Sequence, residues 1–212
     1  MATNGGRRAA LVIGIGNVLW ADEGFGVRAV EALHAAFAFP DGVALMDGGT
    51  LGLALYDEVA RSDRVLVFDA VDYALAPGTL KVLRGDEVPA WGRTKLSPHQ
   101  VGFNDVLGLA ALQGRGPHTV TVIGVQPEVL DDFGGSLRPV VRARLDESVA
   151  LAAAELARWG LAGRRRDAAE QVEPLNDAAL SIDGYETGRP SEQDACRIGD
   201  ARVIARSREG GG

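Results

Sequence analysis

The sequence predicts an α/β fold, a three-layer sandwich in which helices cover both faces of a mostly parallel, five-stranded sheet. Five short apolar runs, bounded by glycine or acidic residues, have the length and composition of strands. Most runs are continuous rather than alternating, which is typical of strands buried on both faces. Helical periodicity falls between them, so strands and helices alternate along the chain. The runs are Ala10–Ile15, Val43–Met46, Val65–Phe68, Leu80–Leu83 and Val120–Val125.

Four helices are expected between and after these strands. The first follows the first strand and carries its apolar residues at Val27, Val30, Leu33 and Phe37. The second is expected over 53–60, and the third begins near Ser97 and runs toward Leu112. A long last helix has an apolar face at spacings of three and four, formed by Val141, Leu145, Val149, Ala152, Leu156 and Trp159. The short turn over 76–79 lets one strand run antiparallel to its neighbour.

The chain of 212 residues is 46% hydrophobic, which is enough to bury one substantial core. Residues 10–160 are expected to form the folded domain, after a flexible N-terminal segment over 1–9. Beyond Gly160 the sequence becomes polar, with few large apolar residues and three glycines at its end. Residues 161–212 are therefore predicted to be a largely disordered tail.

Charge and composition limit the partners and the compartment. The formal net charge of -7 argues against nucleic acid, because phosphate binding needs clustered lysine and arginine. The single cysteine, Cys196, allows no internal disulfide and no thiolate metal cage. No run of about 18 apolar residues occurs, and the first residues lack a signal-peptide pattern. We expect a cytoplasmic monomer without membrane insertion.

A glycine-rich turn with two acids follows the first predicted strand. It begins Gly14-Ile15-Gly16-Asn17 and ends Asp22-Glu23-Gly24. Dinucleotide binding is excluded, because Leu19 stands where the third glycine of that fingerprint belongs. Acids at a helix start would also repel phosphate. Asp22 fits as the N-cap of the first helix and Glu23 as a first-turn acid, so capping alone explains the pair as well as chemistry does.

Two further residues lie at the ends of predicted elements. Asp69 directly follows a buried strand, at the edge where open α/β sheets place ligands. A hydrogen-bonded loop acid is an equally consistent role, and Asp72 competes with Asp69 for the functional one. His99 belongs to Ser97-Pro98-His99-Gln100, a capping box that places it in the first turn of a helix. The helix dipole keeps an imidazole neutral there, ready to bind a metal or accept a proton.

Glu23, Asp69 and His99 together have the composition of an acid-base or metal site. Two carboxylates and one imidazole leave coordination positions open for water or a substrate ligand, and they suit nickel or zinc without selecting either. The zinc-protease pattern His-Glu-x-x-His and the hydrolase pattern Gly-x-Ser-x-Gly are both missing from the sequence.

Four motifs, in order, resemble the nickel-iron hydrogenase maturation endopeptidases. They are Gly14-Ile15-Gly16-Asn17 with Asp22-Glu23-Gly24, Asp47-Gly48-Gly49-Thr50, Phe68-Asp69-Ala70 and Ser97-Pro98-His99-Gln100. The likeness covers about 11–160. It implies a hydrolase, an endopeptidase that removes the C-terminal peptide of the hydrogenase large-subunit precursor after nickel has been inserted.

The resemblance also implies roles for individual residues. Glu23, Asp69 and His99 would contact nickel, which the precursor carries and the isolated protein holds only weakly. Asp47, Gly48, Gly49 and Thr50 would form the substrate-selecting segment, although a tight turn between strand and helix explains these residues equally well.

Two mechanisms and one other function remain open. In the first mechanism, nickel in the precursor is a checkpoint that also polarises the scissile carbonyl or binds the attacking water. In the second, Asp69 or Glu23 is a general base of the aspartyl-protease type, and the metal serves only for docking. The other function is a chaperone that binds the large subunit at the same acidic site without cleaving it.

Overall fold

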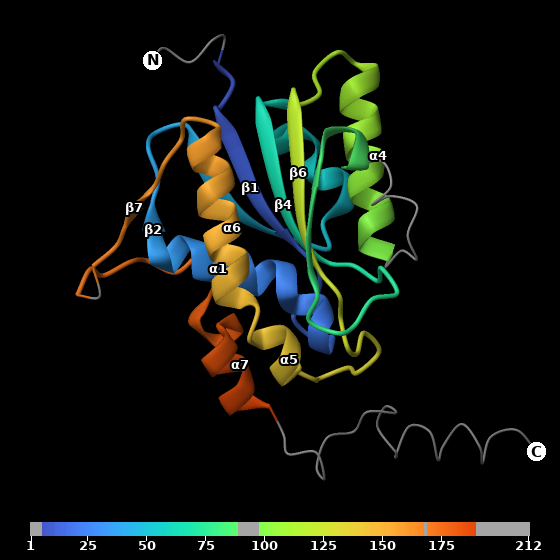
Figure 1. The fold of residues 1–212 in the computed structure, drawn as a ribbon, viewed down its shortest axis with the longest axis vertical. Coiled ribbons are helices and arrows are strands. Elements are labelled where there is room, and N and C mark those ends of the chain that lie inside the picture. Colours follow the sequence, from blue (N-terminus) through green and yellow to red (C-terminus); the bar gives the residue numbers. More distant parts are fainter. Residues whose placement is uncertain (1–5, 89–97, 168, 190–212) are drawn as a thin grey trace, which may run out of the picture.

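The computed structural model describes residues 6–88, 98–167 and 169–189, and its centre is a five-stranded sheet (Figure 1). The strand order is β3-β1-β4-β6-β5. Four strands are parallel and β5 runs antiparallel to β6, so the predicted fold class is confirmed. The strands are β1 (Ala10–Ile15), β3 (Val43–Gly49), β4 (Arg64–Ala70), β5 (Leu80–Arg84) and β6 (Thr119–Val125).

Helices cover both faces of this sheet (Figure 1). One face packs against α1 and α6, and the other against α2 and α4. The helices are α1 (Phe25–Ala36), α2 (Tyr56–Ala60), α4 (Pro98–Leu112), α5 (Pro139–Arg142), α6 (Leu145–Arg158) and α7 (Ile182–Gly188). The 3-10 turns are η2 (Ala21–Gly24), η3 (Gly52–Leu55), η4 (Gly85–Glu87) and η5 (Ala178–Leu180). No helix in the described part of the chain is long and apolar enough to cross a membrane.

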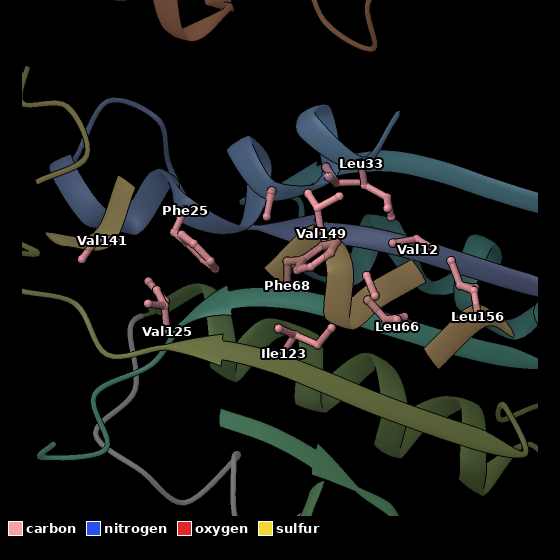
Figure 2. Packing of buried hydrophobic residues seen from close by; sticks show 14 of the residues in the cluster. Val12, Phe25, Leu33, Leu66, Phe68, Ile123, Val125, Val141, Val149 and Leu156 are labelled. Carbon is pink, nitrogen blue, oxygen red and sulfur yellow. The ribbon is translucent and has the colours of Figure 1, made fainter. Parts of the chain in front are cut away.

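Each central strand sends alternate side chains into two separate cores. Toward α1 and α6, the fully buried side chains include Val12, Phe25, Leu33, Leu66, Phe68, Ile123 and Leu156 (Figure 2). Toward α2 and α4, they include Leu11, Ile13, Val59, Val65, Val67, Val106 and Val122. Burying one such side chain contributes roughly 1.5–3 kcal/mol. The continuous apolar runs in the sequence result from this burial on both faces.

Three predicted helices differ from the structure. The first ends at Ala36, because Phe37 has an extended backbone and pairs in β2 (Phe37–Ala38) with β7 (Arg164–Arg165). The helix predicted over 53–60 is η3 followed by α2. The predicted last helix is divided into α5 and α6, and Trp159 is its C-cap. The apolar spacing continues across this break, so periodicity could not reveal it.

The N-terminal segment is held against the domain from Arg7 onward, contrary to the predicted flexibility of residues 1–9. Nε of Arg7 donates to Oδ1 of Asp63 at 2.7 Å. The backbone N–H of Arg8 donates to the carbonyl of Arg61, also at 2.7 Å. The two arginines therefore connect the start of β1 to the turn before β4.

The segment after Gly160 was predicted to be disordered, and over 161–167 and 169–189 this is wrong. These residues form β7, η5 and α7, and in Figure 1 they lie along α1. Leu175 and Ile182 pack against the core on the α1 side. Charged residues are paired here as well, since Glu170 accepts from Arg164 and Arg166. The polar composition gave no sign of these contacts.

Candidate active site

The candidate site lies at the point where the strand order reverses. β1 pairs with β3 on one side and with β4 on the other, and the chain visits β3 before it returns to β4. Ligands of open α/β sheets bind outside the carboxyl ends of the strands at such a point. Asp69 is the penultimate residue of β4, and Glu23 lies in η2, which follows β1 and contacts β4.

Asp69 is 2% exposed and Asp72 is half-buried. Asp69 pairs with Gly124 of β6 in the register of the sheet, so the strand fixes its backbone. Oδ1 of Asp72 instead accepts from the N–H of Ala74 at 2.9 Å and from Nε2 of Gln126 at 3.1 Å. These bonds give Asp72 the geometry of an acid that orders its own loop, which favours Asp69 as the functional residue.

Asp22 and Glu23 are adjacent in sequence but have different surroundings. The predicted N-cap role of Asp22 is wrong, because neither η2 nor α1 has a side-chain cap. Asp22 is fully buried and accepts three backbone N–H bonds from the loop after β6, from Glu128 at 2.8 Å, Val129 at 2.9 Å and Arg138 at 2.7 Å. Asp22 therefore fixes that loop, and Glu23, which is half-buried, remains the candidate for chemistry.

His99 is the second residue of α4. Because α4 leads back to the amino end of β6, its first turn lies at the carboxyl edge, together with Glu23 and Asp69. The side chain of His99 and all of Ser97 lie outside the described residues, so the capping box formed by Ser97 and Gln100 stays a prediction. Within the described residues, no group of three histidine, cysteine or acidic side chains could hold a metal ion.

The segment Asp47–Thr50 lies at the same edge, at the end of β3. Asp47 pairs with Gly14 of β1, and the N–H of Gly16 donates to the carbonyl of Gly49 at 3.0 Å. A cavity of about 270 Å³ lies over this segment, lined by Asp47, Gly48, Gly49, Thr50, Leu51 and Asn176. Burial raises the pKa of Asp47, and a hydrogen bond from Asn176 offsets part of that rise.

Tyr73 was not singled out by the sequence, yet its hydroxyl lies at this site. A Cβ placed on Gly124 would be 2.5 Å from Oη of Tyr73, so the ring lies over the residue that pairs with Asp69. Oη is buried and has no hydrogen-bond partner in the part of the chain that is described. Burial, and then the charge of Asp69, raise the pKa of Tyr73 and keep the hydroxyl protonated. No local sequence pattern marks a tyrosine in this position.

These features define an α/β protein with an acidic site at the switch point of a mostly parallel sheet. The chain belongs to the hydrogenase maturation protease family, whose model matches residues 27–155. This confirms the family that the four sequence motifs predicted.

Relatives of this chain include proteins of known name and structure. Hydrogenase expression/formation protein HoxM of Azotobacter vinelandii is 55% identical over 195 residues, which cover 92% of this chain and 93% of HoxM. The hydrogenase 2 maturation protease of Escherichia coli K12 is 42% identical over 159 residues, covering 74% of this chain and 96% of that protein. The solved structure of the hydrogenase maturating endopeptidase HybD from E. coli matches with a TM-score of 0.71 at 40% identity, covering 74% and 98% of the two chains.

Proposed function

We propose that the protein is an endopeptidase that removes the C-terminal peptide of a nickel-iron hydrogenase large-subunit precursor after nickel insertion. Membership of the maturation protease family supports the reaction class. The main structural support for the proposed active site is that Glu23, which follows β1, and Asp69, at the end of β4, both lie at the switch point of the sheet. We take the cytoplasm as the compartment and the monomer as the active unit.

Glu23, Asp69 and His99 are the proposed site residues, and the nickel they contact belongs to the substrate. Carboxylate oxygens and an imidazole suit nickel, and a set without thiolate should hold it weakly, as expected for a metal that arrives with the precursor. Bound nickel would supply Lewis-acid chemistry at the scissile carbonyl or at water. Asp69, fixed by its strand and 2% exposed, is positioned to hold a proton or a ligand without reorganisation.

Exposed apolar side chains around the site support a protein substrate. Within the described residues, five of the eight exposed large hydrophobic side chains lie just beyond the carboxyl ends of strands, at Leu19, Leu51, Leu53, Leu75 and Phe133. Trp20 extends this surface, with its ring 5.3 Å from that of Phe133. Clustered exposed apolar residues are typical of surfaces that bind proteins. A folded large subunit could therefore dock on this edge while its C-terminus reaches the acids.

The direct test incubates the protein with nickel-loaded and metal-free large-subunit precursor and measures the C-terminal mass by mass spectrometry. Cleavage confined to the nickel-loaded sample is the expected result. Cleavage of both samples would keep the peptidase but favour Asp69 or Glu23 acting on water without the metal. A stable complex without cleavage would support the chaperone function instead.

Substitutions of the two acids test whether each one is required for cleavage. Glu23→Gln and Asp69→Asn should each lower the cleavage rate by about 100-fold or more, the usual loss for a group that transfers a proton or binds the reacting atoms. Asp72→Asn is the matched control, because Asp72 has the contacts of a loop acid. Cleavage by Asp69→Asn at the rate of the unmodified protein would remove Asp69 from the mechanism.

A further inference from the structure

Asn176, in the segment after Gly160, connects two acids that belong to the domain. Its Nδ2 donates to Oδ2 of Asp47 and to Oε1 of Glu31, each at 2.8 Å. An amide nitrogen carries two hydrogens, so Asn176 can serve both carboxylates at once. Glu31 is also paired with Arg28, whose guanidinium donates to Oε2 at 2.9 Å and is 4% exposed. A row of contacts thus runs from Arg28 on α1 to Asp47 on β3.

The second oxygen of Asp47 has different surroundings. Oδ1 is buried and makes no hydrogen bond of standard geometry with the described residues, and the one further donor that acts on the Asp47 carboxylate is the backbone N–H of Gly49. Leaving a buried acceptor unpaired is costly, and such atoms in native proteins call for an explanation, for example a ligand that supplies the missing donor. A Cβ on Gly49 would lie 3.4 Å from Oδ1, and both residues line the cavity of about 270 Å³ that Asn176 also lines.

Resting on the proposed function, we infer that Asn176 positions Asp47 so that Oδ1 binds a basic side chain of the large-subunit precursor. Arg28, whose charge also acts on Asp47, is ion-paired with Glu31, so Asp47 has no ion pair of its own among the residues the structure describes. A lysine or arginine of the substrate supplies both the missing donor and the missing charge. The segment after Gly160 is then one wall of the specificity site.

The inference assigns a role to a residue beyond the match of the family model, in a segment that HoxM, which covers 92% of this chain, also spans. The family model ends at residue 155, and Asn176 lies 129 positions after Asp47. HybD covers 74% of this chain. Substrate selection here therefore depends on a segment that follows the region matched by the family model, in addition to the Asp47–Thr50 loop.

The test replaces Asn176 with leucine, which is similar in size and cannot donate. Gln171→Leu is the matched control, since Gln171 is an exposed amide in the same segment. Affinity for nickel-loaded precursor is measured in an Asp69→Asn background, which prevents turnover, and KM and kcat are measured in the wild-type background. Asn176→Leu should raise Kd and KM about tenfold, the loss expected for a hydrogen bond to a charged group, and leave kcat unchanged. Gln171→Leu should change none of them.

Asn176→Asp is a second variant, which keeps the size of the side chain and replaces the donor by an acceptor. It should raise Kd and KM at least as much as Asn176→Leu. A lower melting temperature in either variant with an unchanged Kd would overturn the inference, because Asn176 would then be purely structural. Wild-type protein that binds the precursor without cleaving it would overturn the proposed endopeptidase alone, and the Kd values of the variants would still decide the role of Asn176.

Discussion

The carbonyl oxygen of Glu23 lies directly against Gly16, so closely that a Cβ on Gly16 would be 1.8 Å from it. Gly16 also has a φ of 131°, a conformation that side chains strongly disfavour. The turn that carries Glu23 therefore folds back onto the end of β1. This contact places Glu23 beside the carboxyl edge of the sheet, where Asp69 lies.

Gly16→Ala should displace the turn that holds Glu23. Overpacking and backbone strain together should lower the free energy of unfolding by about 3 kcal/mol, and precursor cleavage should be lost in the protein that still folds. Urea unfolding and a cleavage assay measure the two effects. Gly114→Ala is the control, because Gly114 also has a positive φ, of 66°, but has nothing within 4 Å of an added Cβ. Cleavage by Gly16→Ala at the wild-type rate would show that the turn does not position a functional group.

Asp22→Asn should loosen the loop that follows β6. Asparagine keeps the size of aspartate, but its NH₂ group cannot accept the backbone N–H bonds that Asp22 accepts. We expect a loss of about 1–3 kcal/mol in the free energy of unfolding. The amides of Glu128, Val129 and Arg138 should also exchange faster with solvent hydrogen. Asp41→Asn, at an exposed acid, should change neither quantity. Unchanged exchange at all three amides in Asp22→Asn would contradict the prediction.

Tyr73→Phe removes a buried hydroxyl that has no partner among the described residues. Because the unpaired group costs free energy in the folded state, the variant should be as stable as the wild type or about 1 kcal/mol more stable. The hydroxyl lies against Gly124, which pairs with Asp69, and the charge of Asp69 acts on it. Loss of the hydroxyl should slow cleavage about tenfold, which corresponds to the loss of one hydrogen bond. Thermal unfolding and single-turnover cleavage give the two results. A variant that is less stable by more than about 1 kcal/mol would show that the hydroxyl has a structural partner.

The strands could be predicted because each one is an apolar run bounded by polar residues, and burial on both faces makes such runs continuous. The edge position of Asp69 followed from the same pattern. The separate roles of Asp22 and Glu23 could not be predicted, because they depend on the loop after β6, more than 100 residues away in sequence. The contact between Asn176 and Asp47 is equally remote, and the polar composition of its segment pointed to disorder.

Glu155 connects α6 to the sheet and should give the protein a pH-dependent stability. It is 2% exposed. Nη2 of Arg84 donates to its Oε2 at 2.8 Å, and Oγ1 of Thr121 donates to its Oε1 at 3.1 Å. Burial alone would raise the pKa of Glu155, but the hydrogen bonds from Arg84 and Thr121 and the charges of Arg84 and Arg158 outweigh it and hold the pKa below its usual 4.5.

Because the native state favours the ionised form of Glu155, its contribution to stability is fully present above the unfolded-state pKa and is lost as the pH falls through the lower native pKa. Glu155→Gln should therefore lower the free energy of unfolding by about 1–3 kcal/mol near neutral pH. The difference from the wild type should shrink as the pH falls below the usual glutamate pKa of 4.5. Urea unfolding over a pH series measures it, with Glu147→Gln as control, because Glu147 pairs with Arg144 but is 55% exposed. A difference that stays constant across the series would mean that packing, rather than charge, accounts for the contribution of Glu155.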